Sequence, residues 1–306
     1  MNFHVRGIFL TVFILLVFGF SLASKTLLGE KSEEEYPSPK AYKRIVSLSP
    51  SVTEMLFALG LGGRIVGVTQ YCDYPPEATK KEKVGGYSNP NYEAIVSLKP
   101  DLVVILPEQK EVGKHLSSLG LDVLTVNNRT VGDILESIHT IGKICVVEKR
   151  ASDLVSGLRG RMEAIRGRTA NLTRPRALVS VARGMGSLGI KTVYIAGKGG
   201  YYDELIELAG GVNVYRDEKV RFPTISREGL IALTPDVILD LVPSVEEKGW
   251  NAAAILKEWE ALDEIKAVKD GRVYVLGRDY VTVPGPRFIL LLEDMAKAMH
   301  PDIRVQ

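Results

Sequence analysis

The sequence has few of the residues that form metal centres and disulfide frameworks. Its 306 residues include two cysteines, Cys72 and Cys145, and four histidines. Two cysteines are too few for a disulfide-rich scaffold or a four-cysteine zinc site, and no two histidines stand at the spacing of a metal site. We therefore expect no metal site. The two cysteines could pair in an oxidising compartment, but nothing in the sequence shows that they lie close together.

An excess of one charge sign is also absent. The chain has 39 Lys+Arg and 37 Asp+Glu, a formal net charge of +2, and no long run of basic residues. Proteins that bind nucleic acid usually carry a basic patch or stripe, so we expect no nucleic-acid partner. With 45% hydrophobic and 25% charged residues, the composition excludes a disordered, collagen-like or coiled-coil protein. The length suggests two domains or one large domain.

The motifs of several common enzyme classes are missing too. The chain has no G-x-S-x-G, P-loop or H-E-x-x-H sequence. Gly184-Met-Gly-Ser-Leu-Gly189 matches G-x-G-x-x-G, but the following Ile190–Ala196 indicates a strand. Dinucleotide binding needs a helix that begins at these glycines. We interpret the run as a loop at the rim of a cleft, and we expect no catalytic residue and no catalytic cofactor.

Long hydrophobic runs are absent except at the N-terminus. There, Arg6 precedes an apolar run from Ile8 to Phe20, and Ser21-Leu-Ala23 fits the small-x-small pattern of a signal-peptidase site. The run is shorter than the roughly 20 residues that span a bilayer. We predict a signal peptide over residues 1–23, a flexible linker over residues 24–42 and export to the periplasm. An uncleaved membrane anchor is the alternative, and the lack of a nearby cysteine argues against a lipid anchor.

The rest of the chain alternates apolar runs, bounded by Gly or Pro, with amphipathic stretches. This pattern is typical of α/β folds with parallel sheets. The predicted strands are Arg44–Ser49, Arg64–Thr69, Leu102–Leu106, Asp122–Val126, Arg176–Ala182, Thr192–Ala196, Val237–Leu241 and Arg272–Leu276. The predicted helices are Val52–Leu59, Glu108–Leu119, Val131–Ile144, Glu148–Ala170, Tyr202–Leu208, Asn251–Ala261 and Pro286–Met299.

One of these helices, Glu148–Ala170, is long and lies near the middle of the chain. At 1.5 Å per residue it would extend about 34 Å, the width of a small domain. We therefore predict two Rossmann-like α/β lobes, residues 43–145 and 173–306, joined by a single long helix within residues 146–172. A ligand cleft is expected between the lobes, and one helix should resist hinge motion better than crossing loops.

An internal repeat supports two related lobes. Residues 91–104 align without a gap with residues 226–239, and Glu93/Glu228, Leu98/Leu233, Pro100/Pro235 and Asp101/Asp236 are identical pairs. Each copy indicates a short helix, a Pro-Asp turn and a buried strand. A weaker similarity links residues 53–63 to residues 202–211. Clefts between such lobes are common ligand sites.

The repeat places an acidic residue in the first helical turn of each copy. Glu93 and Glu228 follow the plausible helix caps Asn91 and Ser226. A carboxylate there stabilises the helix dipole by about 0.3–1 kcal/mol, which explains either residue alone. Two equivalent acidic residues, one on each lobe, also suit docking on a two-fold symmetric partner that carries arginines.

Aromatic residues gather at predicted loops beside Gly and Pro, where they form ligand walls or anchor the loops. They are Tyr71, Tyr74, Tyr87, Tyr92, Tyr201, Tyr202, Phe222 and Tyr280.

Five motifs in order resemble a known family. They are Arg44-Ile-Val-Ser-Leu-Ser-Pro-Ser-Val-Thr-Glu54, Tyr71-Cys-Asp-Tyr-Pro-Pro76, Ile95-Val-Ser-Leu-Lys-Pro-Asp101, Thr224-Ile-Ser-Arg-Glu228 and Pro286-Arg-Phe-Ile-Leu290. Together they resemble the periplasmic cobalamin-binding proteins of ABC importers, within the wider family that captures ferric siderophores and haem. The resemblance covers nearly all of residues 43–300.

The resemblance implies two lobes joined by a rigid helix, with little closure on ligand binding. It also implies that Glu93 and Glu228 dock on arginines of the membrane permease dimer. Ligand-wall positions fall at Tyr71, Tyr87, Leu106, Phe222 and near Tyr280. This chain differs from the best-known cobalamin binder in having Tyr87 and Phe222 where that protein has tryptophans, Leu106 where an aromatic stands, and extra residues after Ala182.

The resulting hypothesis is an exported, monomeric substrate-binding protein that captures a corrinoid and delivers it to an ABC importer. Arg183 and Asp279 are predicted polar contacts to the ligand. The alternative ligands are a ferric siderophore or haem, whose negative charge would favour Arg183, Arg221 or Arg278. An exported metallochaperone or enzyme on the same scaffold is a further alternative.

Overall fold

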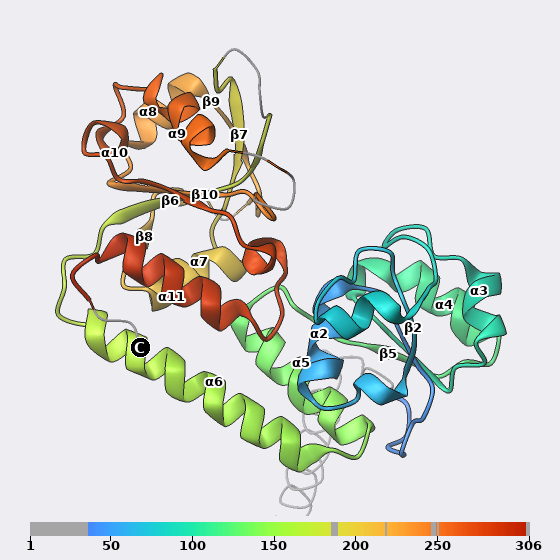
Figure 1. Cartoon of the computed structure of the whole chain (residues 1–306). Coiled ribbons are helices and arrows are strands. Elements are labelled where there is room, and N and C mark those ends of the chain that lie inside the picture. The colour runs from blue at the N-terminus through green and yellow to red at the C-terminus, as the bar shows by residue number, and fades with distance from the viewer. Residues whose placement is uncertain (1–35, 185–188, 218, 246–248, 250, 304–306) are drawn as a thin grey trace, which may run out of the picture. The chain divides into compact units, whose positions relative to one another are not determined.

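The structure, a computed structural model, describes residues 36–184, 189–217, 219–245, 249 and 251–303. The predicted signal peptide, most of the predicted linker and the centre of the glycine-rich run lie outside these ranges. In the part from residue 37 onward, two separate sheets define two lobes, and the long helix α6 lies between them in the sequence (Figure 1). We call them the N-lobe, up to residue 145, and the C-lobe, from residue 173.

The N-lobe sheet is parallel throughout. Its strand order is β3-β2-β1-β4-β5. The strands are β1 (Ile45–Ser47), β2 (Ile65–Val68), β3 (Glu82–Lys83), β4 (Leu102–Ile105) and β5 (Val123–Thr125). The α-helices are α2 (Pro50–Ala58), α3 (Tyr92–Ser97), α4 (Lys110–Ser118) and α5 (Val131–Ile144), with 3₁₀ turns at Gly62–Arg64, Pro76–Lys80 and Pro107–Gln109.

The C-lobe sheet is mixed, which differs from the parallel sheet that the sequence pattern indicated. Its order is β11-β10-β6-β7-β9, with β8 beside β6. The strands are β6 (Arg176–Arg183), β7 (Thr192–Ile195), β8 (Val212–Asn213), β9 (Thr224–Ser226), β10 (Val237–Leu241) and β11 (Val273–Leu276). β7 is antiparallel to both β6 and β9. The link from β6 to β7 is too short for the helical crossover that a parallel pair requires, so β7 folds back beside β6.

The C-lobe helices cover this mixed sheet. They are α7 (Tyr201–Leu208), α8 (Arg227–Leu233), α9 (Ala252–Glu260), α10 (Lys266–Lys269) and α11 (Phe288–Met299), with a 3₁₀ turn at Asp279–Thr282. None of the helices in the described ranges is both long enough and apolar enough to span a bilayer.

The repeated segments fold alike, and their helix caps are the predicted ones. The Asn91 side chain accepts a hydrogen bond from the Ala94 amide at 3.0 Å, and the Ser226 hydroxyl accepts one from the Gly229 amide at 3.3 Å. After each helix, one residue adopts a positive φ, 47° at Lys99 and 44° at Thr234. The sequence similarity therefore reflects a shared backbone path.

Each repeat is tied to the first strand of its own lobe by an aspartate. The Asp101 carboxylate accepts hydrogen bonds from the amides of Lys43 and Arg44, both at 2.8 Å. Asp236 accepts the Arg176 amide at 2.9 Å. The Arg44 and Arg176 guanidinium groups then donate to carbonyls at the ends of α3 and α8. The identical aspartates thus join the repeat helix to a central strand in both lobes.

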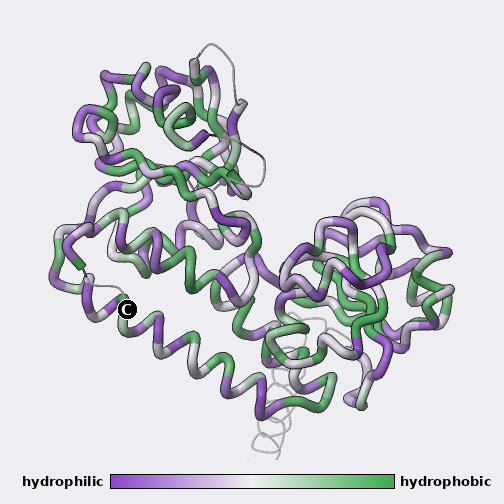
Figure 2. The backbone as a smooth tube through the Cα atoms, in the orientation of Figure 1, coloured by the Kyte–Doolittle hydropathy of each residue, from purple (hydrophilic) through white to green (hydrophobic). Residues whose placement is uncertain are grey.

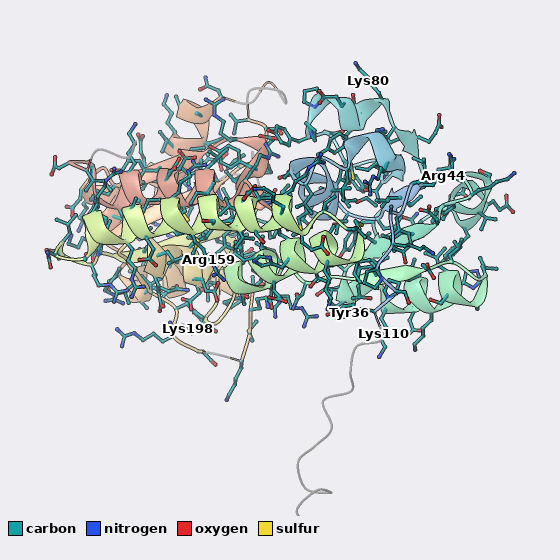
Figure 3. All side chains as sticks on the ribbon, turned by 90° about the horizontal axis from the view of Figure 1, so that it is seen from below. Tyr36, Arg44, Lys80, Lys110, Arg159 and Lys198 are labelled. Carbon is teal, nitrogen blue, oxygen red and sulfur yellow. The ribbon has the colours of Figure 1, made fainter. Side chains whose placement is uncertain are left out.

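The helix α6 (Glu148–Thr169) is held by both lobes and confirms the predicted long helix. Its 22 residues correspond to about 33 Å at 1.5 Å per residue. Arg150 donates to carbonyls at the end of α2 at 3.3 Å, and Arg161 pairs with Glu293 of α11 at 2.6 Å. α6 lies against α5 and α11 (Figure 1), and Figure 3 shows the exposed Arg159 on it. This helix therefore braces the two lobes against each other.

The main hydrophobic core extends through residues of both lobes and of α6. Figure 2 shows hydrophobic segments in both sheets and alternating polar and apolar positions along α6. Cys72 and Cys145 belong to this core, and both are buried, free thiols. The Cys72 thiol makes hydrogen bonds with Thr53 at 3.2 Å and Thr69 at 3.1 Å.

Candidate functional site

A cavity of about 410 Å³ lies between the lobes. The N-lobe side is formed by segments that follow β1, β3, β4 and β5, where the carboxyl ends of parallel strands commonly form ligand sites. Its lining residues are Ser49, Pro50, Ser51, Tyr87, Leu106, Glu108, Asn128 and Arg129. The C-lobe side contributes Val181, Tyr201, Tyr202, Arg221, Phe222, Thr282, Val283 and Pro284.

A buried glutamine holds the N-lobe wall in place. The Gln109 amide group donates to the carbonyls of Tyr87 at 2.8 Å and Leu48 at 2.9 Å, and its side-chain oxygen accepts the Leu106 amide at 3.0 Å. These bonds fasten two wall segments to the end of β1. Gln109 is 3% exposed, so its polar groups are satisfied by these contacts and not by solvent. No pattern in the sequence marks Gln109 as a structural residue.

The polar groups of the N-lobe wall are largely paired with each other. Arg129 binds Glu108 through two nitrogens, at 3.0 and 2.9 Å. The Asn128 side chain donates to the Ser51 hydroxyl at 3.0 Å. The ion pair leaves this wall with no net charge from Glu108 and Arg129.

Three aromatic rings form much of the C-lobe wall. Tyr201 and Tyr202 begin α7 and pack edge to face, with ring centroids 4.9 Å apart. Phe222 contacts Tyr202 at 6.3 Å between centroids, and 46% of Phe222 remains exposed. The Tyr202 hydroxyl donates to the Val281 carbonyl at 3.0 Å and so links α7 to the wall segment after β11. These rings give the cavity a broad apolar surface opposite Tyr87.

The tyrosines of the cavity are neutral at physiological pH. Burial raises the pKa of Tyr87, Tyr201 and Tyr202 above the 10.0 of an exposed tyrosine. Their rings therefore offer stacking surfaces and neutral hydroxyl groups, and they resist forming phenolates.

Next to the cavity, a buried ion pair joins the lobes. Arg287, immediately before α11, binds Glu54 of α2 at 2.6 Å, with side-chain exposures of 12% and 3%. The guanidinium lies 3.5 Å from the ring centroid of Tyr74 in the N-lobe and also pairs with Asp279 at 2.7 Å. Burial is the main cause that raises the pKa of Glu54, and Arg287 opposes it.

A second carboxylate crosses between the lobes in the opposite direction. Glu204 of α7 accepts the backbone amide of Val131, the first residue of α5, at 2.6 Å. The helices α2 and α7 belong to the weaker repeat. Each therefore sends one glutamate to the start of the last helix of the other lobe, Glu54 to α11 and Glu204 to α5. Both contacts cross the lobe interface.

Of the predicted ligand contacts, three line the cavity and four do not. Tyr87, Leu106 and Phe222 line it. Tyr71 is 56% exposed and lies outside the lining. Asp279 binds Arg287, and the Tyr280 hydroxyl donates to Asp294 at 2.7 Å. These last two residues support the lobe interface and α11.

The fourth residue outside the cavity lining is Arg183. Its side chain is 1% exposed and binds Asp240 at 3.0 Å and also Glu258. Asp240 in addition accepts the Trp259 indole N–H at 2.8 Å. The arginine therefore fastens α9 to the sheet, and its charge is paired with two carboxylates of the C-lobe.

The predicted docking residues are exposed and occupy equivalent places. Glu93 and Glu228 lie in the first turns of α3 and α8, one on each lobe. The Glu228 carboxylate accepts the Ser226 hydroxyl at 2.8 Å, and this hydrogen bond is the main cause that lowers its pKa. Both side chains are therefore accessible to a partner.

Several cavity residues have no clear sequence signal. The sequence points to Tyr201 and Tyr202 only as aromatics beside Gly200, and the structure places both in the first turn of α7. Val181 and residues 282–284 have no distinctive composition. No group of three or more His, Cys, Asp or Glu residues in the described ranges is arranged to hold a metal ion.

Comparison with known proteins defines the class. The sequence model of the family named periplasmic binding protein matches residues 45–280. The chain therefore belongs to this family, and it is a substrate-binding protein of the ABC-importer type, the class that delivers small molecules to a permease.

Individual relatives are similar over most of the chain. The uncharacterized ABC transporter substrate-binding lipoprotein YvrC of Bacillus subtilis is 32% identical over 283 residues, covering 90% of this chain and 85% of that protein. The structure of the periplasmic vitamin B12 binding protein BtuF of Vibrio cholerae is similar with TM-score 0.71 and 27% identity, covering 85% and 98%. The periplasmic heme-binding protein RhuT from Roseiflexus sp. RS-1 gives TM-score 0.69 and 27% identity, covering 87% and 99%.

Proposed function

We propose that the protein binds a cobalamin-type corrinoid in the interlobe cavity and delivers it to an ABC importer. The observation that carries the proposal is the pair of apolar walls, with Tyr87 on the N-lobe and Tyr201, Tyr202 and Phe222 on the C-lobe. A corrinoid has a large apolar macrocycle edged by amides, which suits aromatic walls with a few neutral donors. The similarity to a vitamin B12 binding protein supports the same ligand class.

The character of the walls favours a corrinoid over haem. Haem iron in proteins is usually held by an axial His, Met, Cys or tyrosinate. The lining residues within the described ranges include no His, Met or Cys, so only a tyrosine could serve as the axial ligand of haem iron. In cyanocobalamin, cyanide and a base of the ligand itself occupy both axial positions of cobalt. A protein that binds it therefore needs no metal-ligating side chain.

Delivery requires a surface that meets the permease. Glu93 and Glu228 are exposed, equivalent and placed on different lobes. We propose that they dock the monomeric, loaded protein on arginines of a two-fold symmetric permease dimer. This role agrees with export directed by residues 1–23, which we propose to act as a cleaved signal peptide.

A titration tests the ligand. The protein lacking residues 1–23 is mixed with cyanocobalamin, haemin or a ferric hydroxamate, and intrinsic fluorescence and the ligand spectrum are followed. We expect one equivalent of cyanocobalamin to bind with a Kd of about 1 μM or less. Absence of saturable binding at micromolar cyanocobalamin overturns the corrinoid, and saturable binding of haemin or the hydroxamate in its place assigns the alternative ligand.

Two exposed aromatics provide a matched pair of variants. Phe222 lines the cavity and Tyr71 does not, although the family resemblance points to both. Phe222→Ala should weaken cyanocobalamin binding by about tenfold, since an aromatic contact is worth about 1.5 kcal/mol. Tyr71→Ala should change it much less. The reverse order would show that the ligand does not occupy this cavity.

A further inference from the structure

Among the described residues, the cavity lining contains one cation that has no charged partner. Its described lining residues include three charged side chains, Glu108, Arg129 and Arg221. Arg129 and Glu108 form an ion pair at 2.9 Å. Arg221, on the opposite wall, makes no ion pair or side-chain hydrogen bond within the described part of the chain, and it is exposed. The described part of the lining therefore carries a net charge of +1, located at Arg221.

The backbone that carries Arg221 is fixed in place. The Gly197 amide donates to the Arg221 carbonyl at 2.7 Å, and the Ile195 amide donates to the Pro223 carbonyl at 3.0 Å. The approach at Gly197 is so close that a Cβ there would lie 2.1 Å from the Val220 carbonyl oxygen. The strands β7 and β9 thus continue as a ladder up to the cavity and hold residue 221 at its wall.

The side-chain stem of Arg221 is supported as well. Its Cγ and Cδ atoms lie 3.5 and 3.8 Å from the place where a Cβ on Gly200 would stand. Gly200 directly precedes Tyr201 and Tyr202, so the stem runs beside the aromatic wall. The guanidinium is thereby positioned at the edge of the apolar surface, with donors to offer to a ligand.

We propose that Arg221 binds the phosphodiester of the corrinoid nucleotide loop and so selects complete cobalamins over corrinoids that lack the nucleotide. This inference rests on the proposed function. The side chains around a corrin ring are neutral amides, and the phosphodiester is the anionic group of the loop. An arginine matches two phosphate oxygens with two parallel N–H groups, which a neutral donor cannot reproduce at equal strength.

The experiment compares two ligands that differ in the nucleotide loop. Cyanocobalamin contains the phosphodiester, and dicyanocobinamide keeps the corrin ring without it. Isothermal titration is carried out on the wild type, Arg221→Gln, Arg221→Lys and Arg166→Gln. Arg166 is an exposed residue of α6 outside the cavity lining, so its replacement makes the same change of net charge away from the site.

We expect Arg221→Gln to weaken cyanocobalamin binding by about tenfold and to leave dicyanocobinamide binding unchanged. Arg221→Lys should retain part of the preference for cyanocobalamin, and Arg166→Gln should retain all of it. Added salt should reduce the preference in the wild type more than in Arg221→Gln.

Other outcomes overturn the proposal in distinguishable ways. An equal loss for both ligands in Arg221→Gln would show that the residue supports the wall and not the phosphodiester. The same loss in Arg166→Gln would show a general effect of net charge. If the wild type bound neither corrinoid, the proposed function itself would fail, and the inference with it.

Discussion

The two lobes are alike where they carry the repeat and different where they form the cavity. Asp101 and Asp236 fasten equivalent helices to equivalent strands, and those helices present Glu93 and Glu228. The cavity walls have no such correspondence. In the N-lobe they follow the ends of parallel strands, whereas in the C-lobe an antiparallel ladder carries Arg221 and Phe222. A two-fold partner needs equal features on both lobes, but an asymmetric ligand does not.

The contacts across the interface also combine similar positions in the two lobes with different partners. Glu54 and Glu204 come from related helices and reach the starts of α11 and α5. Glu54 meets a half-buried arginine that is also stacked on Tyr74, and Glu204 meets a backbone amide. The two contacts should therefore contribute unequally to the free energy of unfolding, and substitutions can measure the difference.

The largest effect is expected when the ion pair between the lobes is broken. Glu54→Ala leaves the Arg287 charge partly buried with Asp279 as its remaining ion-pair partner, so the free energy of unfolding should fall by about 3–5 kcal/mol. Glu204→Ala removes a charged hydrogen bond to an amide and should cost about 1.5–3 kcal/mol. Urea unfolding of both variants measures the difference. The double variant Glu54→Met with Arg287→Met, which removes both charges, should recover much of the loss.

Equal losses in Glu54→Ala and Glu204→Ala would contradict this ranking of the two contacts. A double variant no more stable than Glu54→Ala would show that the charge left on Arg287 is not what destabilises the protein.

An intermediate effect is expected when the two exposed glutamates of the repeat are replaced. Glu93→Ala together with Glu228→Ala should reduce transport by at least about tenfold, because two charge contacts with the permease are lost. Each single variant should cause roughly half of that loss in free energy. Ligand affinity should stay at the wild-type value, since both side chains are exposed, and stability should fall only by the helix-dipole contribution of about 0.3–1 kcal/mol per residue. Transport is measured with labelled ligand in cells or proteoliposomes.

If ligand affinity fell as much as transport, the two glutamates would contact the ligand or support the fold instead of docking on the permease. A strong effect from one glutamate alone would show that the partner does not use the two-fold similarity of the lobes.

Sequence patterns predicted the local structure well, because it depends on neighbouring residues. The helix α5 has the predicted bounds, and α6 differs by one residue. The antiparallel direction of β7 was missed, although the short link after β6 limits the possible connections. The repeat gave the equivalent positions of Glu93 and Glu228 without any knowledge of tertiary contacts.

The site was harder to predict, because its residues meet only after folding. Arg183 looked available to a ligand, but its partners Asp240 and Glu258 lie far along the chain. The same holds for Glu54 and Arg287, which are 233 residues apart. Nothing near either residue shows that a pair will form, and a buried charge without its partner would be too unstable to remain there.

The smallest effect concerns pH and follows from the burial of both glutamates that cross the interface. Burial raises the pKa of Glu54 and Glu204 above the 4.5 of an exposed glutamic acid. Between the unfolded and folded pKa values, the folded state binds more protons. Their contribution to stability therefore decreases as the pH rises through the range just above 4.5. Carboxylates with a lowered pKa, such as Asp122 and Asp236, act in the opposite sense, so only a difference between variants isolates this term.

The variant Glu54→Gln with Glu204→Gln removes both titrating groups and keeps their approximate shape. Its free energy of unfolding is measured in urea from about pH 4 to about pH 7. The slope of this free energy against pH should be more positive in the variant than in the wild type. Arg287 stays charged throughout this range, so its own titration adds no slope to the difference between the two curves. Parallel curves would show that water reaches both carboxylates in the folded state. If Glu54→Gln alone produced the change in slope, burial would raise the pKa of Glu54 more than that of Glu204.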